Sequence, residues 1–239
     1  MRTTDMADEL FSGAAQPLPA GVRLATARHG GVTVTRVEIA REGLSRPRGR
    51  YVTLEMPSVS VLDERDAAVI EVCARELRAL LPPEGPVLVL GVGNRRITAD
   101  ALGPRTVQRI LVTMGAGAAP PVRGVRPVAA VAPGVAVVCV DSLCSAEGQR
   151  LGRTVQFSDT GLYPAQADHT RHLTRDTLGV PVVAAGIPTL MQAQEGADLV
   201  VTPRALDSVI AHGAALLAGS VNRALQPRLT VQQLCWLTG

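Results

Sequence analysis

The sequence predicts an α/β fold: a three-layer α/β/α domain with a mainly parallel sheet. Continuous apolar runs at residues 87–90, 135–140 and 180–185 are typical of strands buried on both faces of such a sheet. Segments with helical spacing of apolar residues alternate with these runs, which is the order that βα units produce. A chain of 239 residues can form one domain with a well-filled core, so we expect a single domain over residues 1–239.

The N-terminal third is predicted to contain two strands and a helix. Residues 1–20 are small, polar and proline-containing, so we expect this end to be loose. The segment 32–39 alternates with period two and predicts a half-buried strand, and 51–56 predicts a second strand. A helix is predicted over 63–81, with Asp63 as its N-cap and apolar side chains recurring on one face.

The remaining elements follow the apolar run at 87–90. A helix is predicted from Pro104 to about Met114. Residues 115–134 are rich in Gly, Ala and Pro and indicate a long surface connection. Residues 155–157 predict a short strand. A final helix is predicted over 203–224, with the preceding threonine as its N-cap.

Two aspartates stand where predicted core strands end. Asp100 follows the run at 87–90 and a glycine loop at 91–94, and Asp141 directly follows the run at 135–140. Ligands and chemistry collect outside the carboxyl ends of strands in open parallel sheets. We therefore expect the two carboxylates to face one another across a cleft. Such a pair can share a proton and activate a water molecule to hydrolyse an amide, without serine, cysteine or metal.

We expect the glycine loop to have a supporting role. The backbone amides around Gly91, Gly93 and Asn94 are placed to hydrogen-bond the oxyanion that develops during hydrolysis. Both aspartates also have a simpler interpretation, because aspartate is common in helix caps and turns. Asp100 would then cap the following helix, and Asp141 a turn after its strand. Their pairing at strand ends favours the catalytic interpretation.

Composition excludes several classes of protein. A formal net charge of +3, with 2 Phe, 2 Tyr and 1 Trp, does not indicate nucleic-acid binding. All 24 basic residues are arginine, which excludes a lysine nucleophile and a lysine-type phosphate loop. The loop at 91–94 lacks the third glycine of a dinucleotide-binding motif, so we expect no cofactor. Without a signal peptide or membrane-spanning segment, a cytoplasmic location with free cysteines is expected.

Motifs spread over most of the chain carry a family resemblance. They include Gly-Arg-Tyr-Val-Thr-Leu-Glu at 49–55, Gly-Val-Gly-Asn…Thr-Ala-Asp-Ala-Leu-Gly-Pro at 91–104, Val-Asp-Ser-Leu at 140–143, Gln-Phe-Ser-Asp-Thr-Gly at 156–161 and Gly-Ile-Pro-Thr at 186–189. In this order and context, the chain resembles the germination proteases of endospore-forming bacteria.

The resemblance implies an aspartic-type endopeptidase, a homotetramer of the spore core that degrades small acid-soluble spore proteins during germination. The two essential aspartates of the family correspond to Asp100 and Asp141. Family members are made as zymogens that cut themselves after the aspartate of an Arg-Thr-Asp motif, and the matching bond here is Asp5–Met6. Residues 1–5 can bury little apolar surface, so we expect that they do not hold the cleft shut by themselves.

Two alternatives remain open. Hydrogenase maturation proteases look similar in the Gly-x-Gly-Asn…Asp stretch and in fold, and in that case Asp100, Asp141 and a histidine such as His169 would bind a divalent ion. A histidine pair such as His169 and His172 is more typical of a solvated surface, so we expect no metal. The second alternative is a relative that binds spore proteins without cutting them, because the chain is shorter than is usual for the family.

Overall fold

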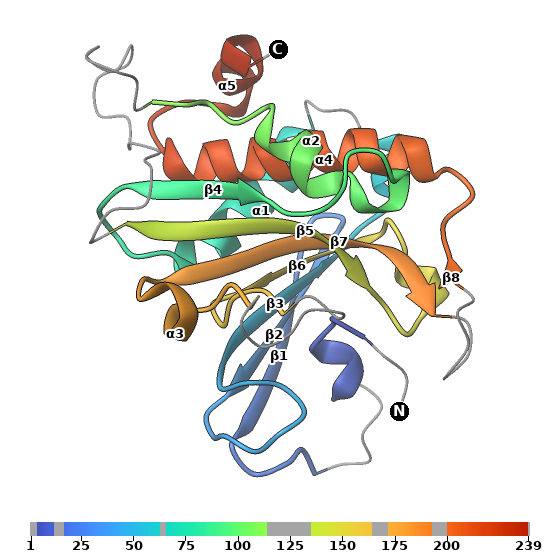
Figure 1. The fold of residues 1–239 in the computed structure, drawn as a ribbon, viewed down its shortest axis with the longest axis vertical. Coiled ribbons are helices and arrows are strands. Elements are labelled where there is room, and N and C mark those ends of the chain that lie inside the picture. Colours follow the sequence, from blue (N-terminus) through green and yellow to red (C-terminus); the bar gives the residue numbers. More distant parts are fainter. Residues whose placement is uncertain are drawn as a thin grey trace.

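The computed structural model describes residues 4–11, 17–62, 66–113, 135–163, 172–192 and 200–238. Its sheet contains eight strands in the order β1-β2-β3-β6-β7-β5-β4, with β8 paired to β7 (Figure 1). The strands are β1 (Val22–His29), β2 (Val32–Ile39), β3 (Gly49–Glu55), β4 (Val87–Gly91), β5 (Ala136–Cys144), β6 (Thr154–Ser158), β7 (Val182–Gln192) and β8 (Val200–Val201). The predicted α/β class is confirmed.

The prediction of a mainly parallel sheet was wrong, because the sheet is mixed. Parallel pairing joins β4 to β5 and β5 to β7. The chain of neighbours β1, β2, β3, β6 and β7 is antiparallel throughout. Short connections join antiparallel neighbours, whereas parallel neighbours need a crossover. The apolar runs therefore indicated only the parallel part of the sheet. The consecutive strands β1 to β3 form an antiparallel part. The sequence pattern does not predict β1.

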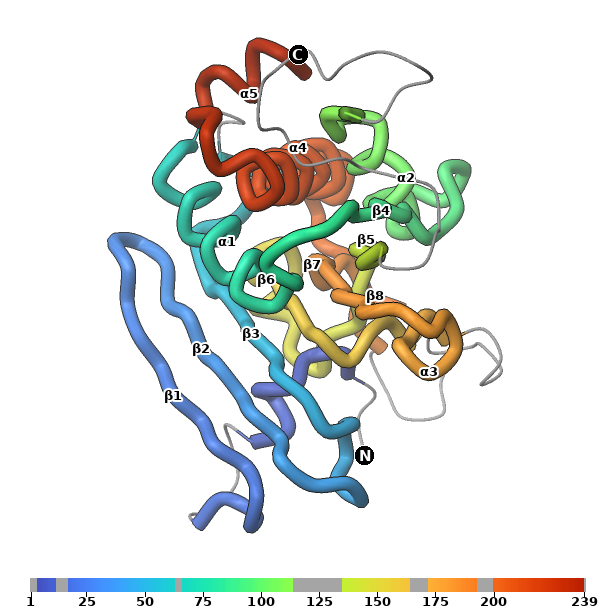
Figure 2. The backbone as a smooth tube through the Cα atoms, turned by 90° about the vertical axis from the view of Figure 1, so that its left-hand side faces the viewer, coloured from blue at the N-terminus to red at the C-terminus, as the bar shows by residue number. Residues whose placement is uncertain are grey.

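Three helices lie on one face of the sheet. They are α1 (Ala67–Leu80), α2 (Leu102–Val107) and α4 (Leu206–Leu225) (Figures 1 and 2). Their apolar side chains form the main core with the sheet, in which Leu77 and Leu217 are fully buried. Two further helices, α3 (Arg175–Leu178) and α5 (Val231–Thr238), are not predicted by the sequence pattern. No helix in the described ranges is long and apolar enough to cross a membrane.

The helix ends differ from the prediction. Helix α1 has Asp66 at its N-cap, and Asp63 lies outside the described residues. Helix α2 ends at Val107, well before Met114, which also lies outside them together with the connection at 115–134. Helix α4 begins at Leu206 rather than at 203. The pairing of β8 with β7 keeps the backbone extended as far as residue 201, so the Thr-Pro signal just after it is part of the turn into the helix.

The N-terminal segment 4–11 packs on the face of the sheet opposite α1 and α4 (Figures 1 and 2). It contains the 3-10 turn η1 (Asp8–Leu10). Met6 and Ala7 are fully buried, and Ala7 and Phe11 belong to a second core on β1, β2 and β3. The expectation that residues 1–20 are loose does not hold for this part. Its few apolar residues show no period, so the sequence pattern carries no sign of the packing.

Candidate active site

Asp141 lies inside β5 rather than after its end. The strand continues to Cys144, but its parallel partner β4 stops at Gly91, which pairs with Val140. Asp141 is therefore the first residue of β5 beyond β4, and Gly186 of β7 pairs with it on the other side. The residue is 8% exposed. The end of the apolar run thus marked the end of the neighbouring strand, which opens the space for a polar side chain.

Burial raises the pKa of the Asp141 carboxyl from 3.8 to about 7. This net value includes the charges of Asp100 and Asp5, which add to the effect of burial, and the Ser142 amide, which donates to Asp141 Oδ1 at 2.8 Å and lowers the pKa. Beside it, Ser142 Oγ is buried and has no hydrogen-bond partner among the described residues. A carboxyl with a pKa near neutrality can act as a general acid or base under physiological conditions.

Asp100 ends the 3-10 turn η3 (Thr98–Asp100), between the glycine loop and α2. The backbone N–H of Asn94 donates to the Asp100 carbonyl oxygen at 3.0 Å and to Asp100 Oδ2 at 2.7 Å. Helix α2 has Ala101 at its N-cap and no side-chain capping bond there. The capping interpretation of Asp100 is therefore wrong, since its carboxylate closes the glycine loop and contributes its charge at Asp141.

The glycine loop is shaped by close backbone approaches. Gly93 has a φ of +120°, and a Cβ there would lie 2.1 Å from the carbonyl oxygen of Asp100. A Cβ on Gly91 would lie 2.3 Å from the carbonyl oxygen of Gly103 in α2. An oxyanion role for Gly91, Gly93 and Asn94 stays a prediction. For Asn94 it requires that the backbone N–H releases Asp100 and donates to the oxyanion instead.

The N-terminal segment reaches this site through Asp5. Its backbone N–H donates to the Cys144 carbonyl oxygen, and the Cys144 N–H donates to Asp5 Oδ2, both at 2.8 Å. Asp5 Oδ1 lies 3.8 Å from a guanidinium nitrogen of Arg46. Burial raises the pKa of the Asp5 carboxyl, although the Cys144 amide and Arg46 oppose this. The sequence pattern carries no sign that Asp5 lies near enough to Asp141 for its charge to raise the pKa of Asp141.

Residues beyond Asp5 anchor the segment through buried charges. Arg150 contacts the carboxylates of Asp8, Glu9, Glu55 and Glu147 at 2.6, 3.5, 3.1 and 3.1 Å. The Asp8 and Glu9 side chains are 2% and 4% exposed. Glu9 also accepts hydrogen bonds from Ser145 Oγ and from the Ala146 N–H. These polar contacts hold residues that follow the Asp5–Met6 bond. The expectation that residues 1–5 do not hold the cleft shut by themselves stays a prediction.

Gln156 is a site residue that sequence reasoning missed. Its Oε1 accepts from the Ala7 N–H and its Nε2 donates to the Asp5 carbonyl oxygen, both at 2.7 Å. Gln156 of β6 pairs with Gly186, which in turn pairs with Asp141. The motif around residues 156–161 was visible in the sequence, but a glutamine in a strand has no chemical signature by itself.

The histidine named in the metal alternative cannot be placed relative to the carboxylates. His169 lies outside the described residues. The His172 ring packs edge to face against Tyr163, with ring centroids 4.9 Å apart. Within the described ranges, no group of three His, Cys, Asp or Glu side chains is arranged to hold a metal ion.

Comparison with known proteins decides the family. The sequence model of the germination protease family matches residues 6–138 and 136–195. The chain belongs to the germination protease family. The germination protease of Clostridium perfringens (strain SM101 / Type A) is 29% identical, over 85% of this chain and 87% of that protein. The germination protease of Caldanaerobacter subterraneus subsp. tengcongensis is 30% identical, over 90% of this chain and 91% of that protein. That of Bacillus subtilis (strain 168) is 34% identical, over 69% of this chain and 55% of that protein.

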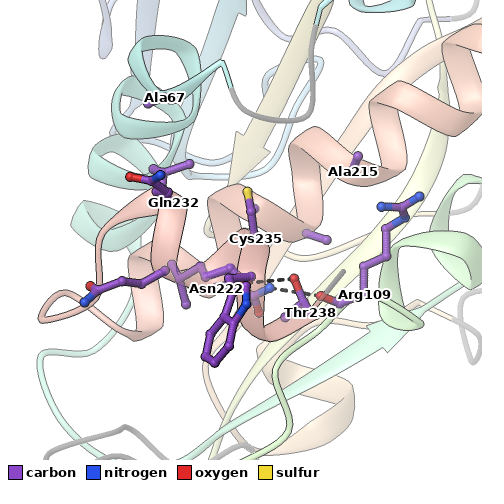
Figure 3. A pocket seen from close by; sticks show the side chains of 13 residues that line it. Ala67, Arg109, Ala215, Asn222, Gln232, Cys235 and Thr238 are labelled. Carbon is purple, nitrogen blue, oxygen red and sulfur yellow. Dashed lines mark hydrogen bonds between the residues drawn. The ribbon is translucent and has the colours of Figure 1, made fainter.

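This germination protease homologue also has a cavity of about 1050 Å3 away from the carboxylates (Figure 3). Residues of α4 and α5 line most of it, and neither Asp100 nor Asp141 does. Asn222 and Arg109 lie together in it, where the Asn222 side-chain amide donates to the Arg109 carbonyl oxygen at 2.9 Å (Figure 3). The cavity therefore belongs to the outer side of the helical layer and not to the candidate active site.

Proposed function

We propose that this protein is an aspartic-type endopeptidase that hydrolyses small acid-soluble spore proteins during spore germination. Membership of the germination protease family supports a protease. The observation that carries the mechanism is the Asp141 carboxyl, whose pKa is raised to about 7 by burial, with the charge of Asp100 adding to the effect. Two carboxyls that lie near enough for the charge of one to act on the other can share a proton.

In the proposed mechanism, Asp141 and Asp100 act as an acid and base pair. Asp141 is buried and keeps its proton, so it hydrogen-bonds the scissile carbonyl and later helps to protonate the leaving amine. Asp100 is half-buried on the glycine loop and takes the proton of the attacking water. No cofactor or metal takes part in this scheme.

The proposed setting follows from the same family. The protein would act in the spore core, as one catalytic domain whose three-layer fold is similar to that of hydrogenase maturation proteases. It would be made as a zymogen and cut itself at the Asp5–Met6 bond. Neither nucleic acid nor membrane is a partner in this proposal.

Incubation of the purified protein with a small acid-soluble spore protein tests the proposed function. We expect discrete fragments, identified by mass spectrometry, and no loss of activity with EDTA, because the two carboxyls activate the water themselves. Loss of cleavage with EDTA, restored by a divalent ion, would support the metal-dependent alternative. Tight binding without fragments would support the non-catalytic alternative.

We further propose that the protein forms a homotetramer and that α5 contributes to its interface. Trp236 is 85% exposed and Leu237 is 38% exposed, beside the cavity between α4 and α5. Large exposed apolar side chains next to a groove are typical of interaction surfaces. Trp236→Gln is expected to shift the mass measured by light scattering towards smaller species, while an unchanged tetramer would exclude this face.

A further inference from the structure

We propose that Gln156 polarises the carbonyl group of the scissile peptide bond. We also propose that residues 5–7 lie in the site where the chain to be cut is bound. This assignment rests on the proposed function. It gives a role in catalysis to a residue of β6, on the far side of β7 from the strand that carries Asp141.

The side-chain amide of Gln156 holds the backbone on both sides of Met6. Its Nε2 donates to the carbonyl oxygen of Asp5, and its Oε1 accepts from the Ala7 N–H, both at 2.7 Å. The first of these groups is the carbonyl of the Asp5–Met6 bond. Gln156 is 7% exposed and Met6 is fully buried, so both hydrogen bonds are shielded from water. Hydrogen bonds in such surroundings are stronger electrostatically than those in water.

The same face of the sheet carries Asp141. Asp141 pairs with Gly186 and Gly186 with Gln156, and side chains directly opposite one another point to the same face. Adjacent strands are about 4.8 Å apart, so the α-carbons of Asp141 and Gln156 are separated by about 10 Å. A peptide group fits between a carboxyl and an amide side chain over this span. The Asp5 charge raises the pKa of Asp141, which agrees with a segment that passes close to it.

The chemistry of this bond gives Gln156 a defined task. The oxygen of water bonds to the Asp5 carbonyl carbon, its proton passes to the base of the carboxyl pair, and the carbonyl oxygen becomes negative. The Nε2–H of Gln156 already points at that oxygen and would stabilise the charge. When the carbon–nitrogen bond breaks, the acid of the pair gives its proton to the Met6 nitrogen. Removal of a single oxyanion donor typically lowers kcat about 10²–10³-fold.

Gln156 also anchors the segment, and the experiment must separate this from polarisation. The full-length chain is purified at pH 9, where Asp141 is ionised, and self-cleavage is started by a shift to pH 6.5. Mass spectrometry follows the loss of residues 1–5. Hydrogen exchange of the Asp5 amide, which donates to the Cys144 carbonyl oxygen and not to Gln156, is measured on each variant and reports the fraction of the segment that is docked.

Three variants are compared with the wild type. Gln156→Met keeps the volume of the side chain but removes both hydrogen bonds. Ser145→Ala loosens the segment at Glu9 and leaves the Asp5 carbonyl contact intact. Gln149→Met changes an exposed glutamine whose amide donates to Glu147, and it serves as the control.

We expect Gln156→Met to cleave itself about 10²–10³-fold more slowly, a loss well beyond the increase in the exchange of the Asp5 amide. The self-cleavage rate of Ser145→Ala should fall only in proportion to the increase in its amide exchange. Gln149→Met should cleave itself at the wild-type rate. A rate for Gln156→Met that follows the exchange would overturn the assignment, leaving Gln156 as an anchor. An intact Asp5–Met6 bond in a wild-type protein that cuts spore proteins would also overturn it. A wild type that cuts neither its own chain nor spore proteins would refute the proposed function and the assignment with it.

Discussion

Asp141→Asn and Asp100→Asn are each expected to lower the rate of spore-protein cleavage by about 10²–10⁴-fold, the range of general acid–base catalysis. Asparagine keeps the shape of the side chain and can still accept the hydrogen bonds from the Ser142 and Asn94 amides. It cannot donate or accept the catalytic proton. The loss should therefore appear in kcat, with little change in KM.

The measurement needs a control for general effects of removing a charge. Asp207→Asn changes an exposed aspartate in the first turn of α4, away from the sheet edge that carries Asp141, and should cleave at the wild-type rate. Circular dichroism of all the variants establishes that they are folded. Near wild-type activity in either Asp100→Asn or Asp141→Asn would exclude the paired-aspartate mechanism.

Asp141→Asn is also expected to stabilise the protein at alkaline pH. Because the folded-state pKa of Asp141 is raised from 3.8 to about 7, the fold favours its protonated form. The resulting stabilisation is fully present below pH 3.8 and is lost as the pH rises through 7. Asparagine stays neutral and escapes this loss. At pH 8 the free energy of unfolding of Asp141→Asn should exceed that of the wild type by about 1–4 kcal/mol.

Urea unfolding at pH 4, 6 and 8 measures this difference. The two proteins should be closely similar at pH 4 and diverge as the pH rises, while Asp207→Asn should follow the wild type. Cleavage by the wild type should fall above pH 7 for the same reason, since the acid of the pair is then ionised. Parallel stability curves for wild type and Asp141→Asn would show that Asp141 titrates near its ordinary pKa. The burial of Asp141 is the reason why its charge affects stability.

Much of the secondary structure could be predicted from local patterns. The apolar runs and the alternating segments are confirmed as β2 to β7. Helical spacing found α1, and the start signals at Pro104 and at residues 202–203 found α2 and α4. The patterns failed where neighbours decide the conformation. β1 is an edge strand with many exposed residues, so its side chains show no clear alternation. The Thr-Pro signal predicted the start of α4 too early, because the pairing of β8 with β7 keeps the backbone extended up to residue 201.

The sequence by itself determined the family and singled out Asp100 and Asp141, because motif order and strand-end aspartates are properties of the linear chain. Only the tertiary structure decided which other groups belong to the site. Gln156 contacts the Asp5 carbonyl across 151 positions of sequence, and a hydrogen bond at that separation depends on the pairing order of the whole sheet. The pKa of Asp141 likewise depends on burial by several elements at once. Local patterns reflect the period of a segment and its two faces, whereas desolvation and long-range contacts arise only when the segments pack.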